Sequence, residues 1–215
     1  MLANDKQRKS FKALFEKGRK LTYKKGELII RANETPTGVF LIESGLVKAY
    51  DITKYGEENL LIIRKAGEIF PLIWSVTGED KLVVYEAMSP VEIWKVDRDE
   101  YLDYLQNNKE ALPPFIDLVI AMYRMHSLRI INLEYRTVKE RVVAFLLLMA
   151  ERFGEESGSK IIISAPLRRI DIASSVNATR ETTGREIVAL ERNKLIETNN
   201  SVISILDIQK LKKLL

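Results

Sequence analysis

The sequence predicts an α+β fold with a β-rich N-terminal part, one long helix and a smaller C-terminal part of helices and a hairpin. Three patterns predict it: short apolar runs between turn residues in the N-terminal half, a helical apolar period over 112–135, and two short helical patterns followed by two strand-like runs. With 215 residues, 46% of them hydrophobic and 30% charged, the chain can bury sizeable cores. We expect the divisions 1–108, 109–136 and 137–215.

The N-terminal part contains apolar or alternating runs of strand length. Gly26, Gly45, Gly67 and the turn Lys54-Tyr55-Gly56 separate them. We expect strands at 27–31, 38–42, 46–51, 60–64, 82–87 and 91–96. This pattern is typical of a small antiparallel β-roll.

The segment 112–135 is the longest periodic stretch, and Pro113 and Pro114 suit its first turn. One apolar row follows heptad spacing: Leu112, Ile116, Val119, Tyr123, His126, Ile130 and Leu133. A second row beside it contains Phe115, Leu118, Met122 and Met125. One row can cover the roll while the other packs on a second copy, so we expect a long dimerisation helix and a homodimer.

His126, the single histidine of the chain, lies on the heptad row. A packed, hydrogen-bonded interface histidine is the simpler interpretation of this position. A pH switch or a haem ligand is the alternative.

A further helix follows directly. Thr137 and Glu140 have the spacing of a capping box, and Gly154 suits the end of the helix that starts there. We therefore expect a hinge between domains at Tyr135-Arg136.

The segment 167–206 has the pattern of a winged helix-turn-helix. Apolar residues at spacing three over 167–176 predict a short helix, Asn177 tolerates a positive φ, and Thr179 is a good N-cap for a second helix over 179–191. Two strand-like runs around Asn199-Asn200 then predict a hairpin, the wing.

The second helix carries Arg180, Glu181 and Arg185 on one face. A guanidinium matches the paired acceptors of guanine in the major groove, and a carboxylate can accept from cytosine N4. Taken alone, this face could equally be a solvated surface with ion pairs. The preceding turn and the following wing favour base reading. Gly184 costs about 1 kcal/mol in a helix interior, which indicates a close approach to something, as to a groove wall.

The stretch 166–206 resembles the DNA-binding domain of the cyclic-AMP receptor protein and fumarate–nitrate regulator (Crp/Fnr) superfamily, and KGELIIRANETPTGVFLIESGLVKAY resembles its cyclic-nucleotide-binding-like β-roll. The resemblance implies that Arg180, Glu181 and Arg185 contact bases. It further implies phosphate contacts by Arg168, Arg169 and Thr179. It also implies a half-site near TGTGA in double-stranded DNA and RNA polymerase as a partner.

The effector region departs from that pattern. Pro71-Leu72 stands where cyclic-nucleotide binders of this family have a Gly-Glu pair, and Leu82-Val83 stands in their Arg-Ser region. A phosphate buried without a cationic partner is costly, which argues against cyclic AMP. We expect a small effector other than cyclic AMP, or none; a cyclic-nucleotide regulator with an atypical pocket is the alternative. The candidate pocket residues, which could equally fill the roll core, are Arg64, Ile73, Trp74, Val83 and Tyr85.

The composition excludes several classes of protein. The absence of cysteine removes disulfides, iron–sulfur clusters and thiolate-bound zinc, so we expect no cofactor. The roll contains no histidine, and the chain has no Walker, GxSxG or HExxH motif, so we do not expect an enzyme. The longest apolar run, 142–150, is too short to span a bilayer, and no signal peptide is visible, so we expect a cytoplasmic protein without a membrane partner. A ligand-binding signalling module without DNA contact remains the alternative from another class.

Overall fold

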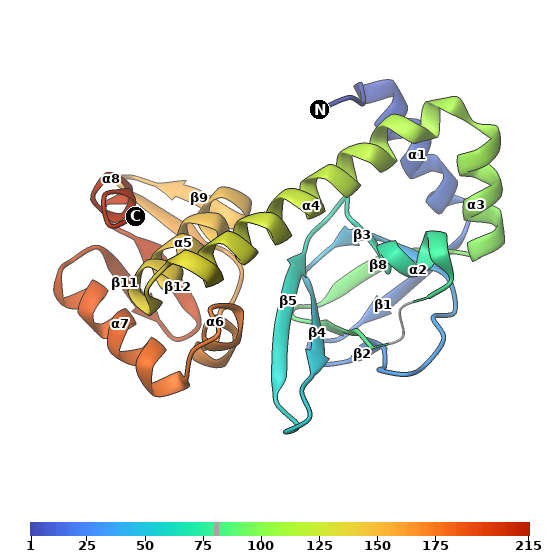
Figure 1. Cartoon of the computed structure of the whole chain (residues 1–215). Coiled ribbons are helices and arrows are strands. Elements are labelled where there is room, and N and C mark those ends of the chain that lie inside the picture. Colours follow the sequence, from blue (N-terminus) through green and yellow to red (C-terminus); the bar gives the residue numbers. More distant parts are fainter. Residues whose placement is uncertain (80–81) are drawn as a thin grey trace. The chain divides into compact units, whose positions relative to one another are not determined.

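The computed structural model describes residues 1–79 and 82–215, which form two compact units, 1–125 and 126–215 (Figure 1). The elements of the first unit are α1 (Asp5–Glu16), β1 (Arg19–Tyr23), β2 (Leu28–Ile30), β3 (Val39–Ser44), β4 (Val47–Ile52), β5 (Glu58–Arg64), β6 (Ile69–Phe70), α2 (Leu72–Thr77), β7 (Val84–Ala87), β8 (Val91–Val96), α3 (Arg98–Asn107) and the 3₁₀ turn η1 (Lys109–Ala111). The helix α4 (Leu112–Tyr135) begins in the first unit and ends in the second. The second unit continues with α5 (Val138–Phe153), β9 (Gly154–Ser157), β10 (Lys160–Ile163), α6 (Arg169–Ser175), α7 (Arg180–Arg192), β11 (Ile196–Asn199), β12 (Val202–Ile205) and α8 (Ile208–Lys212).

The first unit is an antiparallel β-roll, as the sequence predicts. Its two four-stranded sheets have the strand orders β1-β8-β3-β6 and β2-β7-β4-β5. All six expected strands are present, with ends shifted by a few residues. The strands β1 and β6 were not predicted from the sequence, because β1 is mostly exposed and β6 has only two residues.

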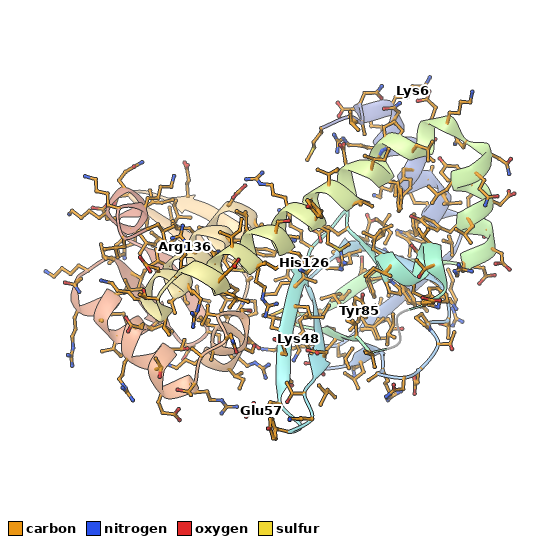
Figure 2. All side chains as sticks on the ribbon, viewed as in Figure 1. Lys6, Lys48, Glu57, Tyr85, His126 and Arg136 are labelled. Carbon is orange, nitrogen blue, oxygen red and sulfur yellow. The ribbon has the colours of Figure 1, made fainter. Side chains whose placement is uncertain are left out.

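An aromatic stack occupies the roll interior. Phe70 stacks on Phe40 and on Tyr85, with ring centroids 5.2 and 4.9 Å apart, and all three rings are buried. Tyr85 lies among the strands of this unit in Figure 2. Such offset stacks add stability beyond the burial of their area.

The helices α1 and α3 cover one side of the roll. Phe11 and Phe15 of α1 meet Tyr101 of α3 with ring centroids 6.3 and 5.9 Å apart. These helices were not among the expected elements. The Asn4–Gln7 capping box and the spacing of Phe11, Leu14 and Phe15 are the signals that predict α1.

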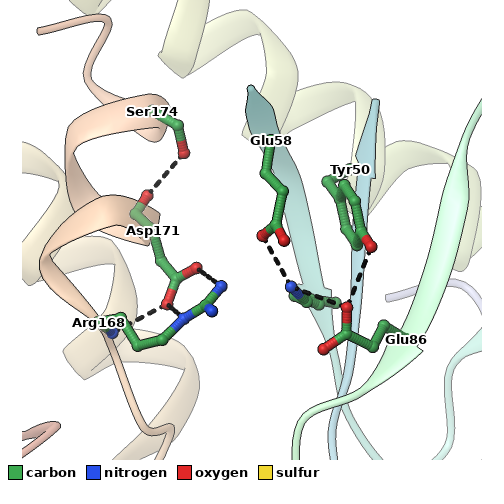
Figure 3. A network of polar contacts seen from close by, with 7 residues as sticks. Tyr50, Glu58, Glu86, Arg168, Asp171 and Ser174 are labelled. Atoms are coloured by element: carbon green, nitrogen blue, oxygen red, sulfur yellow. Dashed lines mark hydrogen bonds and ion pairs between the residues drawn. The ribbon is translucent and has the colours of Figure 1, made fainter. Parts of the chain in front are cut away.

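A buried lysine, Lys48, lies on β4 and is paired with the carboxylates of Glu58 and Glu86, which are labelled in Figure 3. Lys48 Nζ lies 2.8 Å from Glu58 and 3.0 Å from Glu86, and the Tyr50 hydroxyl donates to Glu86 at 3.0 Å. A buried charge without partners would be strongly destabilising, so these pairs are needed to keep Lys48 inside.

The first half of α4 covers the roll with one row and exposes another. Phe115, Leu118, Val119 and Met122 pack on one core cluster, and Met125 packs on the other. Leu112, Ile116, Ile120 and Tyr123 are exposed. Val119, which the sequence pattern placed on the heptad row, therefore packs on the same core cluster as Phe115, and Ile120, four residues after Ile116, is exposed.

The second unit contains a four-stranded antiparallel sheet in the order β11-β12-β10-β9, with helices packed on it. The capping box of Thr137 and Glu140 and the end of α5 before Gly154 are both confirmed. The strand β9 is exposed at every residue, so it lacks the apolar pattern that would predict it. No helix within 1–79 and 82–215 is long and apolar enough to cross a membrane.

Candidate nucleic-acid interface

The helices α6 and α7 and their turn form a helix-turn-helix. Asn177 has φ 49°, as its turn position predicts, and the Ala178 backbone N–H donates to the Ala173 carbonyl at 3.0 Å. Thr179 caps α7, because its Oγ1 accepts from the Thr182 backbone N–H at 3.1 Å. The turn thereby fixes where the first residues of α7 lie.

The helix α7 has one buried and one open face. Thr183, Ile187 and Leu190 are at most 2% exposed and hold the helix on the domain core. On the opposite side, an open surface hollow is lined by the three predicted base readers and their neighbours: Arg169, Arg180, Glu181, Gly184, Arg185, Val188, Ala189, Arg192 and Asn193. The structure thus brings the three predicted base readers and Arg169 onto one surface, where the arginines outnumber the carboxylate.

Glu181 is held in its ionised form on this surface. The pKa of Glu181 lies below its ordinary value because the carboxylate accepts from its own backbone N–H and from the Thr179 hydroxyl, with further lowering by Arg180 and Arg185. An ionised carboxylate only accepts hydrogen bonds, which suits a donor such as cytosine N4.

Gly184 leaves open space in the hollow. A Cβ built there would meet only the Arg169 guanidinium, at 3.9 Å. Packing within this chain therefore does not require glycine at this position, and the helix has no positive φ there.

Arg168 is bonded to Asp171, a residue outside the predicted site (Figure 3). Asp171 is 2% exposed and accepts from the Arg168 backbone N–H at 2.9 Å, from Nε at 2.9 Å and from Nη2 at 2.7 Å. The bidentate pair closes the N-terminus of α6 and fixes the Arg168 side chain. An acid three residues after the N-cap is the signal that could have found Asp171.

The wing is tied to both helices. Asn200 has φ 54°, which confirms the expected hairpin turn, and the Leu167 backbone N–H donates to the Ser201 carbonyl at 2.7 Å. Glu191, near the end of α7, accepts from the Thr198 backbone N–H at 3.1 Å and from the Thr198 hydroxyl. The wing, the start of α6 and the end of α7 therefore hold one another in place.

Two family models match this arrangement. The cyclic nucleotide-binding domain matches residues 20–108, and the Crp-like helix-turn-helix domain matches residues 140–214. The chain belongs to the Crp/Fnr family. It is therefore a transcription regulator of that family, with a helix-turn-helix DNA-binding domain.

Relatives of this Crp/Fnr chain are regulators rather than enzymes. It is 24% identical to the global nitrogen regulator of Synechococcus elongatus over 185 residues, 85% of this chain and 83% of the relative. It is 28% identical to electron transport regulator A of Shewanella oneidensis over 199 residues, 91% of this chain and 78% of the relative. The structure of FixK2 from Bradyrhizobium japonicum shares the fold, with a TM-score of 0.78, 21% identity and coverage of 91% of this chain and 96% of that one.

The candidate effector residues of this Crp/Fnr chain do not share one core cluster. Val83 and Tyr85 belong to the cluster with the aromatic stack, Trp74 belongs to the cluster under α1 and α3, and Ile73 is 53% exposed. Trp74 also lies under the guanidinium of Arg98, 5.6 Å from its ring centroid.

Arg64 is the unusual member of that set. Its strand partner Val47 is fully buried, and Arg64 itself is only 6% exposed. Its Nη1 lies 3.7 Å from Glu68, its Nη2 donates to Met122 Sδ on α4 at 3.5 Å, and its Nε has no hydrogen-bond partner among the residues that the structure describes. A buried guanidinium with so few acceptors has capacity for an anion.

Within residues 1–79 and 82–215, no three His, Cys, Asp or Glu side chains are grouped as a metal-ligand set.

Proposed function

We propose that this Crp/Fnr chain acts as a homodimer that reads a palindrome of TGTGA-like half-sites through α7. The observation that supports it is the exposure of Arg180, Glu181 and Arg185 on the face of α7 opposite its buried side. Two guanidiniums and one ionised carboxylate suit the guanines and cytosines of such a half-site. The proposed phosphate contacts are Arg168, Arg169 and Thr179. Arg168 would contact the phosphate while its side chain stays bonded to Asp171.

The exposed row of α4 supports the dimer. Ile116, Ile120 and Tyr123 are 39%, 59% and 70% exposed, and adjacent exposed apolar side chains on one helix face favour association. A parallel pair of such helices would set two recognition helices about 34 Å apart, one turn of DNA. His126, one turn beyond Tyr123 on the heptad row, is proposed to be a packed interface residue.

The proposed effector is a small organic anion other than cyclic AMP. Arg64 would bind its anionic group, because this buried guanidinium has an unpartnered Nε and contacts α4 through Met122. Of the other candidates, Val83 and Tyr85 lie in the same core as the stacked rings, so an apolar effector body would have to displace part of that packing. We also propose a cytoplasmic protein that contacts RNA polymerase once it is bound at its site.

Fluorescence anisotropy with two labelled duplexes tests the DNA reading. One duplex carries the palindrome, and the other has the same composition in scrambled order. We expect Arg185→Ala and Arg180→Ala each to weaken specific binding by about 1–3 kcal/mol while binding of the scrambled duplex stays nearly constant. Equal losses on both duplexes would contradict base reading, and no preference by the unmodified chain would overturn the proposed half-site.

A further inference from the structure

The connection between α4 and α5 is short and firmly closed. Only Arg136 and Thr137 separate the two helices, and Arg136 is labelled at this junction in Figure 2. The Thr137 backbone N–H donates to Glu140 at 2.8 Å, and Thr137 Oγ1 accepts from the Glu140 backbone N–H at 3.3 Å. This reciprocal cap fixes the direction in which α5 leaves the junction.

Arg141, one residue further along α5, bridges this junction and the turn of the helix-turn-helix. Its Nη1 donates to the Arg136 carbonyl at 2.9 Å, its Nε to the Val176 carbonyl at 2.8 Å and its Nη2 to the Asn177 carbonyl at 3.3 Å. All three acceptors are backbone oxygens. The guanidinium therefore works as a rigid three-way connector and not as half of an ion pair.

Two of the three acceptors lie at the C-terminal end of α6 and in the turn that follows it. Val176 is the C-cap of α6, where unpaired carbonyls carry partial negative charge. Arg129, in the last part of α4, reaches the same helix end, where its Nη2 donates to the Ser174 carbonyl at 3.4 Å. The end of the long helix and the start of α5 are thus both bonded to the C-terminal end of α6.

The C-terminal end of α6 is joined to the recognition helix α7 by a very short turn. Ala178 alone separates Asn177 from Thr179, the N-cap of α7, and Arg180 and Glu181 follow at once. A displacement of the α4–α5 junction would be passed by Arg141 to the turn and so to the first residues of α7.

We propose that Arg141 is a positioning residue for DNA reading, which ties the α4–α5 junction to the N-terminus of α7. The inference rests on the proposed function, since it assigns Arg141 a part in base reading through α7. Lysine replaces it only in part, because a single ammonium does not reach all three carbonyls as the planar guanidinium does.

The variants Arg141→Gln and Arg141→Lys test the proposal against Lys139→Gln. Lys139 is exposed on the same turn of α5, so its substitution removes the same charge without removing the connector. Affinity for the palindromic and the scrambled duplex is measured at a temperature where circular dichroism shows every variant folded. We expect Arg141→Gln to lose about 10-fold or more in specific affinity, Arg141→Lys to lose about half as much on a logarithmic scale, and Lys139→Gln to lose less than about 3-fold.

Two readouts separate positioning from mere folding. Partial unfolding lowers affinity for both duplexes equally, whereas a misplaced α7 lowers the preference for the palindrome. In an Arg185→Ala background the loss caused by Arg141→Gln should also shrink, because the two residues act on the same base contact. Retained preference in Arg141→Gln, or full additivity with Arg185→Ala, would overturn the proposal.

Hydrogen exchange gives a test without DNA. Amides of 178–182 should exchange faster in both Arg141 variants than in Lys139→Gln, while the amides in the middle of α5 keep their protection. Unchanged exchange at 178–182 would refute the role of Arg141, whatever the result of the DNA titrations. If the unmodified chain showed no preference for the palindrome, that result would instead count against the proposed function.

Discussion

Thr183 offers a stabilising substitution within the recognition helix. The residue is fully buried on the inner face of α7, and within 1–79 and 82–215 its Oγ1 has no hydrogen-bond partner. A buried hydroxyl without a partner loses its water without compensation, at a cost of about 1–3 kcal/mol. Thr183→Val replaces the hydroxyl by a methyl of similar size and keeps the β-branch, so helix propensity hardly changes.

We expect Thr183→Val to stabilise the second unit by about 1 kcal/mol. For a unit of this size, about 1 kcal/mol corresponds to a rise in Tm of about 4–8 °C. Urea and thermal unfolding followed by circular dichroism measure both quantities. The matched control is Thr182→Val, because the Thr182 Oγ1 is bonded to the Thr179 hydroxyl at 3.0 Å and its side chain is only partly buried. This control should be neutral or slightly destabilising.

A loss of stability in Thr183→Val would refute the reasoning, since it would mean that the hydroxyl is satisfied, for example by a carbonyl one turn earlier in the helix. DNA affinity supplies a second check. Because Thr183 faces the core, the affinity of the variant for the palindrome should match that of the unmodified chain.

Three further predictions concern the DNA face, the dimer and the effector. Gly184→Ala should raise the stability of the second unit by about 1 kcal/mol, because the site has room for a Cβ. The same change should weaken binding of the palindrome, because the added methyl would meet the wall of the groove. Unchanged affinity in anisotropy titrations would show that DNA does not approach this position. Ile120→Glu places a charge in the exposed row of α4 and should lower the mass measured by light scattering from that of a dimer to that of a monomer. The control Lys109→Glu, which lies before that helix, should leave the mass unchanged. A dimer that survives Ile120→Glu would show that the interface does not lie on this row. Cyclic AMP should leave both Tm and DNA affinity unchanged. A clear rise in Tm on its addition would contradict the inference from Leu82-Val83, which stands where the resemblance places an Arg-Ser pair.

The second unit was the more predictable from sequence, since its signals are local. The capping box at Thr137 and the turn residues Asn177 and Asn200 each fix backbone geometry within a few positions, and all three lie where their residue type requires. The tie to Glu191 was missed because its partner Thr198 is recognised only once the helix and the wing are placed, whereas Asp171 carries a local signal, its position three residues after the N-cap.

The roll was predictable in outline and not in detail. Its strands follow apolar alternation, but the exposed β1 and the two-residue β6 carry no such pattern. Which row of α4 meets the roll depends on three-dimensional contacts, so heptad spacing alone grouped Val119, which packs on the roll, with the exposed Ile116 and Tyr123. The candidate effector residues are ordinary core types, so sequence could not separate Trp74 from Tyr85, which lie in different clusters.

The bonds from Leu167 to Ser201 and from Thr198 to Glu191 limit how the recognition helix can be transferred to another protein. Both bonds begin and end within residues 167–201, so both are kept when this segment is moved as a whole. Transplanting α7 alone into another scaffold would cut the connection at Thr198 and leave the Glu191 carboxylate without its partner. A graft that alters target preference should therefore carry at least 167–201 as a single piece, together with an arginine at the position of Arg141.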